Sequence, residues 1–315
     1  VSKYPIDYYR VDTVKHVDGT TWSAFKNALT AIDPDFKMIG EWAGAGYGTD
    51  TGMLRAGRMD SLLDFDFNDQ AAKFVTGDLA GAENFLSARN AAIDNTASLG
   101  AFLSSHDENG FIYTLMSKGK SEEEARNLAL VAASLQLTAK GQVVIYYGEE
   151  IGNSDGEENY PYNTNRNDFD WSKVTDDNAA LAHYKKMLAI RNQYTDVLAK
   201  GTRTTIAADN AKGLDVFKRS YGDTELTIAL NVTNEPVTYS VSLGSEYANA
   251  DLKDRYSRKS YKADDMGNVE ITVPAAADGG TVVLARTGAD EMDRGYQVTF
   301  DYNCDELAPV TIEVE

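Results

Sequence analysis

Three stretches of the chain decide its fold: residues 8–16, YYRVDTVKH; residues 37–42, KMIGEW; and residues 101–110, AFLSSHDENG. In each, a short apolar strand pattern ends in an acidic side chain, which is Asp12, Glu41 or Asp107. Side chains two apart on a strand share a face, so Arg10 and Asp12 point the same way. In β/α barrels the carboxyl ends of the strands carry the active site. The three acids are therefore predicted to gather at one edge of a parallel sheet.

Two of these acids fit the two different roles in a catalytic pair of carboxyl groups, one ionised and the other protonated. The guanidinium of Arg10 favours the ionised form of Asp12, as a nucleophile requires. Glu41 leaves an apolar strand beside the indole of Trp42, where desolvation favours the protonated form of a general acid. Taken singly, each acid could be a structural ion pair or a solvated loop residue. Two carboxylates with opposite protonation needs, together with a third, are the equipment for cleaving a glycosidic bond.

Strands and helices alternate along the first 200 residues. Strands are predicted at residues 8–14, 37–42, 62–67, 101–105 and 142–147, the last of them buried on both faces. Helices are predicted at residues 20–32, 82–94, 121–140 and 176–198. The pattern supplies about five β/α units, whereas a closed barrel needs eight. It therefore predicts either a smaller open sheet or part of a barrel.

The helix ends carry local signals. Thr20 or Thr21 is predicted to cap the first helix, and Ser121 with Glu124 has the spacing of a capping box. His183 falls within the last helical pattern, where it is expected at the surface rather than as a metal ligand.

The pattern changes after Gly201. From residue 201 to residue 286, short apolar runs are separated by turn residues without a helical segment, which predicts an antiparallel β-sandwich domain. Residues 287–315 form an acidic tail or the start of a further module.

Composition excludes some classes of partner. The 315 residues include 30 Lys and Arg against 49 Asp and Glu, a net charge of −19. Such a chain repels phosphate backbones and anionic lipid, so neither nucleic acid nor a membrane is expected as partner. No apolar stretch approaches the ~20 residues that cross a bilayer. Cys304 is the single cysteine and cannot form an internal disulfide.

The three strand ends resemble, in order and spacing, three of the four short motifs of the alpha-amylase family of glycoside hydrolases. The likeness continues through residues 144–150, VIYYGEE, and residues 165–171, and it covers about residues 4–286. It implies the fourth, fifth, seventh and eighth strands of a (β/α)8 TIM barrel. Residues 1–200 would then be the second half of the catalytic barrel, followed by the β-sandwich domain.

The resemblance also implies roles for single residues. Asp12 matches the nucleophile that forms a covalent glycosyl-enzyme, Glu41 the general acid/base, and Asp107 the acid that holds hydroxyls of the distorted sugar. A retaining mechanism places the first two carboxyl groups about 5–5.5 Å apart. Substrate-binding positions are matched by Arg10, Lys15, His16 and His106, and sugar rings could stack on Trp42, Tyr160 and Tyr162.

Some family features are altered or missing. Tyr8 stands where the family usually has glycine, and Ser105 replaces a common asparagine. Nothing in the 315 residues resembles the family's first motif, an Asp followed by Asn-His. We therefore expect a companion fragment, the N-terminal half of the barrel, without which this chain neither folds stably nor hydrolyses glucan.

Calcium is expected only through the resemblance. The backbone carbonyl at the position of His16 is a calcium ligand in many members, most of whose other ligands would lie in the companion half. No side chain of this chain is predicted to bind a metal ion. An extracellular location is expected, because polymeric starch does not enter cells.

The leading hypothesis is a retaining hydrolase of α-1,4 bonds in starch-like glucans. An α-1,6 debranching enzyme of the pullulanase type and a glucan transglycosylase remain open, because these motifs are shared. An inactive relative that only binds glucan is a non-enzyme alternative. Such a relative would be expected to have lost one or more of the three acids, all of which are present.

Overall fold

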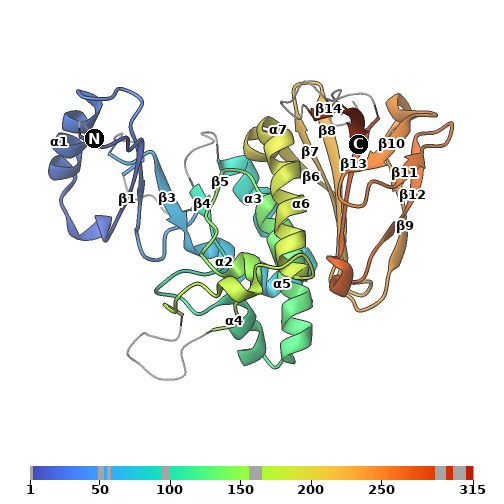
Figure 1. Ribbon diagram of the computed structural model, residues 1–315, viewed down its shortest axis with the longest axis horizontal. Helices are drawn as coiled ribbons and strands as arrows, with labels where there is room; N and C mark the ends of the chain where they lie inside the picture. Colours follow the sequence, from blue (N-terminus) through green and yellow to red (C-terminus); the bar gives the residue numbers. More distant parts are fainter. Residues whose placement is uncertain are drawn as a thin grey trace.

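The computed structural model describes residues 3–48, 53–54, 58–93, 99–155 and 165–287, and the backbone of residues 296–300 and 310–314. Figure 1 shows the parallel strands on one side of the molecule, helices in the middle and an antiparallel β-domain on the other side. Within these ranges no helix combines the length and apolarity needed to cross a bilayer.

The first sheet consists of parallel strands in chain order. They are β1 (Tyr8–Val11), β2 (Lys37–Gly40), β3 (Ser61–Asp64), β4 (Leu99–Ala101) and β5 (Gln142–Val143). A doubly wound sheet reverses its strand order at a switch point, and this sheet does not. Within the described residues it is open, with β1 and β5 at its edges.

The sheet curves strongly enough for its two edge strands to share a hydrogen bond. The hydroxyl of Tyr8 donates to Gln142 Oε1 at 2.9 Å and also lies 2.9 Å from Ser61 Oγ. In a flat sheet, strands β1 and β5 would stand about 19 Å apart, beyond the reach of these two side chains. Tyr8, which replaces the usual glycine, therefore spans the concave face of the sheet.

Helices follow most of the strands. They are α1 (Gly19–Thr30), α2 (Phe65–Val75), α3 (Leu79–Ala92), α4 (Phe111–Ser117), α5 (Glu122–Leu137), α6 (Ala179–Gln193) and α7 (Thr195–Lys200). Short 3-10 turns lie at η1 (Val14–His16), η2 (Glu149–Ile151) and η3 (Trp171–Lys173). The single helix predicted over residues 176–198 is thus two helices that meet at Tyr194.

One predicted helix cap is confirmed and one is wrong. Ser121 and Glu124 form both hydrogen bonds of the capping box at the start of α5. At α1 the cap is Asp18, whose carboxylate accepts the backbone N–H groups of Thr20 and Thr21 at 3.0 Å. The two threonines already lie inside the helix, so the sequence prediction placed its start too late.

The prediction for β5 was also too long. The strand ends at Val143, and residues 142–146 are only partly buried, not covered on both faces. In the described part β5 is an edge strand that pairs only with β4. Without a partner on its other side, the apolar run beyond Val143 forms no further ladder.

The β-domain is built from two sheets. The larger contains, in spatial order, β11 (Ser260–Lys262), β10 (Asp251–Asp254), β13 (Thr281–Arg286), β8 (Thr224–Asn231), β7 (Leu214–Tyr221) and β6 (Thr202–Asp209). The smaller pairs β12 (Asn268–Val273) with β9 (Val237–Ser242). Apolar residues of both sheets form one buried cluster, which confirms the predicted antiparallel sandwich. Strands β14 (Tyr296–Phe300) and β15 (Val310–Val314) pair antiparallel.

The larger sheet is buried on its second face as well. Phe217, Leu226 and Ile228 pack in the same core cluster as residues of α2, α5 and α6. His183 on α6 is 2 % exposed, so its predicted surface position was wrong. Its ring nitrogens lie 3.0 Å from Ser134 Oγ and 2.7 Å from the Tyr256 hydroxyl, and burial lowers its pKa to about 4.

A buried arginine joins the β-domain to two helix ends. Arg219 on β7 is fully buried, and its guanidinium donates to the carbonyls of Thr138, Val197, Leu198, Gly201 and Thr202. These carbonyls lie at or just beyond the ends of α5 and α7, where helices leave carbonyl groups unpaired and favour a cation.

Candidate active site

The three predicted acids follow parallel strands at the same edge of the sheet. Asp12 comes directly after β1, Glu41 directly after β2, and Asp107 in the segment after β4. In the sheet β1 and β2 are neighbours, and β3 lies between β2 and β4. Figure 1 shows β1, β3 and β4 in this sheet. The fold thus brings strand ends from distant parts of the sequence to one edge, as the strand pattern predicted.

Arg10 connects the first two acids. Its Nη1 lies 2.5 Å from Asp12 Oδ1, and its Nη2 lies 3.3 Å from Glu41 Oε2. The side chain of Asp12 is 63 % exposed, whereas that of Glu41 is 12 % exposed. Hydrogen bonding to Arg10 is the largest cause of the lowered pKa of the Asp12 carboxyl, and hydrogen bonding to Glu41 is the second largest. The arrangement keeps Asp12 ionised and open to a substrate.

Backbone contacts fix the two strand ends against each other. The Glu41 N–H donates to the Val11 carbonyl at 2.8 Å, and the Val14 N–H donates to the Glu41 carbonyl at 2.9 Å. Between them Thr13 adopts a left-handed conformation with φ 47°, and its N–H donates to Glu41 Oε2 at 3.0 Å. A left-handed threonine is rare, and such strain occurs where the surrounding structure requires it.

Asp107 belongs to a second polar group. Its Oδ2 lies 2.9 Å from His106 Nε2, and its Oδ1 accepts Arg166 Nη2 at 2.6 Å. Arg166 Nε also donates to the backbone carbonyl of His106 at 2.9 Å. Arg166 lies in the segment of residues 165–171, which resembles the family, but no role at the site was predicted for it. The two residues are far apart in the sequence, so the only signal for the contact between Arg166 and Asp107 was that Arg166 lies in this segment.

The loop that carries Arg166 is anchored to the segment that carries Asp107. Asn165 Nδ2 donates to the carbonyls of Ser105 and Glu108 at 3.0 and 2.6 Å. The Tyr146 hydroxyl donates to the Asn165 carbonyl at 2.7 Å. Ser105, which replaces the usual asparagine, accepts the Asp107 N–H at 3.1 Å through its side chain.

The group around Asp107 lies near the group around Asp12 and Glu41. The charge of His106 is accordingly one of the smaller causes that lower the pKa of Asp12. Other predicted substrate-binding residues lie around Asp12 and Glu41. Lys15 and His16 are exposed in η1, and Trp42 is partly buried and packs against an apolar cluster that includes Val14.

Two of the predicted sugar-stacking residues, Tyr160 and Tyr162, lie outside the described residues. The described residues contain no cluster of three or more His, Cys, Asp or Glu side chains placed to hold a metal ion.

The comparison with protein families gives a match to the description "Alpha amylase, catalytic domain" over residues 2–171, more than half of the chain. The chain belongs to the alpha-amylase family. It is similar to neopullulanase 2 of Thermoactinomyces vulgaris, with 27 % identity over 74 % of this chain and 38 % of the relative. It is also similar to a periplasmic alpha-amylase of Escherichia coli, with 30 % identity over 72 % of this chain and 33 % of the relative.

Solved structures of alpha-amylases show the same fold. The Anoxybacillus enzyme matches with a TM-score of 0.72 and 22 % identity, covering 90 % of this chain and 60 % of that structure. The Geobacillus thermoleovorans enzyme, complexed with acarbose, matches with a TM-score of 0.73, 22 % identity and coverage of 91 % and 61 %. The match spans 33–38 % of the length of the first curated relatives.

Proposed function

We propose that this chain carries the catalytic acids of a retaining α-glucan hydrolase that cleaves α-1,4 bonds in starch-like polysaccharides. The observation that carries the proposal is the pair of carboxyl groups, Asp12 and Glu41, held by one guanidinium at neighbouring strand ends. Both carboxyl groups reach the guanidinium of Arg10, and hydrogen bonding to Arg10 and then to Glu41 lowers the pKa of Asp12. This proximity supports the close spacing of retaining enzymes over the about 6.5–9.5 Å of inverting ones.

The proposed reaction has two steps. Asp12 attacks the anomeric carbon and forms a covalent glycosyl ester while Glu41 protonates the departing oxygen. Glu41 then removes a proton from water, which attacks the anomeric carbon, releases the sugar and restores the Asp12 carboxylate. Asp107, oriented by His106 and Arg166, accepts hydrogen bonds from sugar hydroxyls.

We further propose that the five-stranded sheet is an arc of a (β/α)8 barrel completed by a companion N-terminal half. The consecutive parallel order, the two open edges and the strong curvature support this. On this proposal the chain alone neither folds stably nor hydrolyses glucan. Intact masses and N-terminal sequences of all polypeptides in the purified enzyme test it, with a second chain of barrel-half size expected. A soluble, cooperatively melting and active 1–315 chain would contradict it.

Bond specificity is tested by products. We expect the enzyme to release linear maltodextrins from amylose, and Asp12→Asn and Glu41→Gln to abolish this release. Some relatives of this chain are amylopullulanases, so cleavage of α-1,6 bonds in pullulan is the second candidate. Larger sugars formed from maltotriose would instead identify a transglycosylase, and glucan binding without new reducing ends would identify an inactive relative.

We also propose that the enzyme is extracellular. We further propose that it binds a calcium ion partly through the backbone carbonyl of His16. Activity in the culture fluid, and its loss on chelation with recovery on added calcium, are the results expected.

A further inference from the structure

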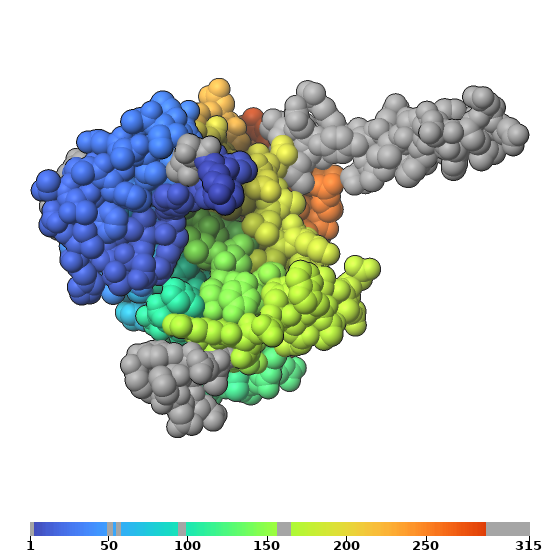
Figure 2. Space-filling view, turned by 60° about the vertical axis from the view of Figure 1, so that its left-hand side comes forward, coloured from blue at the N-terminus to red at the C-terminus, as the bar shows by residue number. Residues whose placement is uncertain are grey.

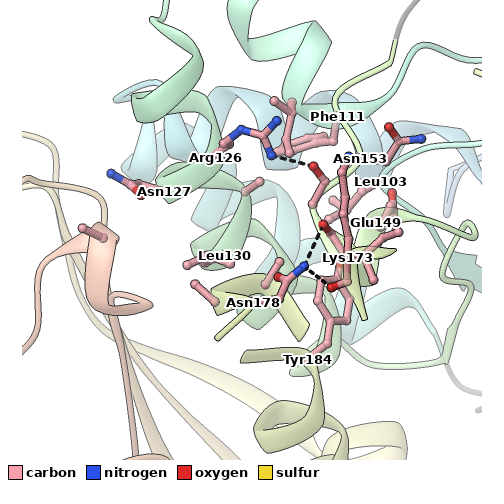
Figure 3. A pocket seen from close by; sticks show the side chains of 17 residues that line it. Leu103, Phe111, Arg126, Asn127, Leu130, Glu149, Asn153, Lys173, Asn178 and Tyr184 are labelled. Carbon is pink, nitrogen blue, oxygen red and sulfur yellow. Dashed lines mark hydrogen bonds between the residues drawn. The ribbon is translucent and has the colours of Figure 1, made fainter. Parts of the chain in front are cut away.

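A cavity of about 440 Å³ lies beside the segment that leads to Asp107, and none of the predicted site residues lines it. Its walls come from α4, α5, η2 and the start of α6 (Figure 3). Most of the wall is apolar and is formed by Leu103, Phe111, Ile112, Leu130 and Ile151, among others. Its volume lies in the range of small-molecule sites.

One buried polar atom without a partner lines this cavity. Glu149 Oε1 is buried and has no hydrogen-bond partner, while its Oε2 accepts the Tyr146 N–H at 3.3 Å, and Ser104 also interacts with the carboxyl group. Burial raises the pKa of Glu149 to about 8, and nearby Glu150 adds to the rise. The side chain of Tyr184, which is 4 % exposed, also lines the cavity. Buried polar atoms normally have partners, so the unpartnered Glu149 Oε1 marks a position in the cavity where a ligand can donate a hydrogen bond.

The cations that line the cavity are already neutralised. Arg126 Nη2 lies 2.7 Å from Glu122 Oε1, and Arg126 Nη1 donates to the Gly152 carbonyl at 2.6 Å. Lys173 Nζ lies 3.9 Å from Asp170 Oδ2. Glu149, by contrast, forms no ion pair with any residue in the described ranges. A cationic ligand would stabilise the ionised form of Glu149 and pair with it, whereas an anionic ligand would find no unpaired cation and would disfavour that ionisation.

We propose that this cavity binds a small organic cation, a primary ammonium group attached to an apolar body. The ammonium donates hydrogen bonds to Glu149 Oε1 and to the hydroxyl oxygen of Tyr184. The apolar body packs against Leu103, Phe111 and Ile112. Charge-assisted hydrogen bonds are about twice as strong as neutral ones, so the head group sets the specificity. This site is separate from the proposed glucan site, and its occupation does not depend on hydrolysis.

Three probes that share a benzene ring test the charge preference. Benzylamine, benzyl alcohol and benzoate are titrated separately into the purified complete enzyme by calorimetry at neutral pH. Benzylamine is expected to bind at one site, about tenfold or more tighter than benzyl alcohol, with benzoate weakest. Equal affinity of amine and alcohol, preference for benzoate, or no binding of benzylamine would overturn the proposal. So would displacement of benzylamine by maltotriose, because the amine would then occupy the glucan site.

Two variants, each with one glutamate replaced by glutamine, test where benzylamine binds. Glu149→Gln is expected to weaken benzylamine binding about tenfold and to leave benzyl alcohol binding unchanged, which also shows that the variant is folded. Glu123→Gln, exposed in the first turn of α5, is expected to leave both affinities unchanged. The same benzylamine affinity in both variants would refute the assignment.

Discussion

Replacing Glu149 by Gln should make the stability of the protein less dependent on pH. Burial raises the pKa of this carboxyl from 4.5 to about 8 in the folded protein. As pH rises between these values, the unfolded chain releases its proton while the folded chain must keep it or bury a charge. The folded state therefore loses stability over this window, and the loss is complete above pH 8.

The size of the effect follows from the two pKa values. One pKa unit corresponds to about 1.4 kcal/mol, so the interval between 4.5 and about 8 corresponds to about 5 kcal/mol at most. A glutamine at this position does not titrate. The free energy of unfolding of Glu149→Gln, relative to the unaltered protein, should thus rise by up to this amount between pH 4.5 and pH 8.

Urea unfolding at a series of pH values measures this difference. Glu270→Gln serves as the control, because Glu270 is exposed on β12 and the substitution changes the charge equally. The free energy of unfolding of Glu270→Gln, relative to the unaltered protein, should not change with pH. A flat difference for Glu149→Gln as well would refute the reasoning, since it would mean that Glu149 is ionised at neutral pH without cost.

Three further predictions concern other described contacts. Arg219→Met leaves five carbonyl groups without their donor and should lower the free energy of unfolding by about 3 kcal/mol, measured by urea unfolding. A loss under about 1 kcal/mol would contradict a stabilising role for these hydrogen bonds. Tyr8→Phe removes the hydrogen bond across the sheet and should cost about 1 kcal/mol in the same assay, and an unchanged midpoint would argue against that bond. Arg10→Gln should raise the pKa of Asp12 and shift the acidic limb of the kcat/KM profile to higher pH, so an unmoved limb would exclude Arg10 as the cause.

Local signals in the sequence were sufficient where the interaction is itself local. The capping box joins Ser121 to Glu124 three residues on, so its spacing contains the whole interaction. The edge at which the three acids lie was also predictable, because parallel strands place their carboxyl ends at one edge of a sheet. The strands themselves end two to four residues earlier than predicted, and helix α2 begins at Phe65, inside the strand predicted over residues 62–67.

Distant partners explain what the sequence could not show. His183 has a helical pattern that fits a surface position, yet it is buried by Tyr256 and Ser134, which come from other parts of the chain. Arg166 reaches Asp107 only because the loop after β5 folds back over the segment after β4. Figure 2 shows that segments far apart in the sequence share one surface, with N-terminal residues in blue next to residues from the middle of the chain in green.

The most direct test of the catalytic assignment is to trap the glycosyl-enzyme. The Glu41→Gln variant of the complete enzyme is mixed with α-maltosyl fluoride, whose fluoride leaves without protonation, and is quenched in acid. Peptide mass spectrometry should then find a maltosyl group on the peptide that contains Asp12, because water attack lacks its general base. A maltosyl group on another carboxylate, or turnover of the fluoride without any adduct, would contradict Asp12 as the nucleophile.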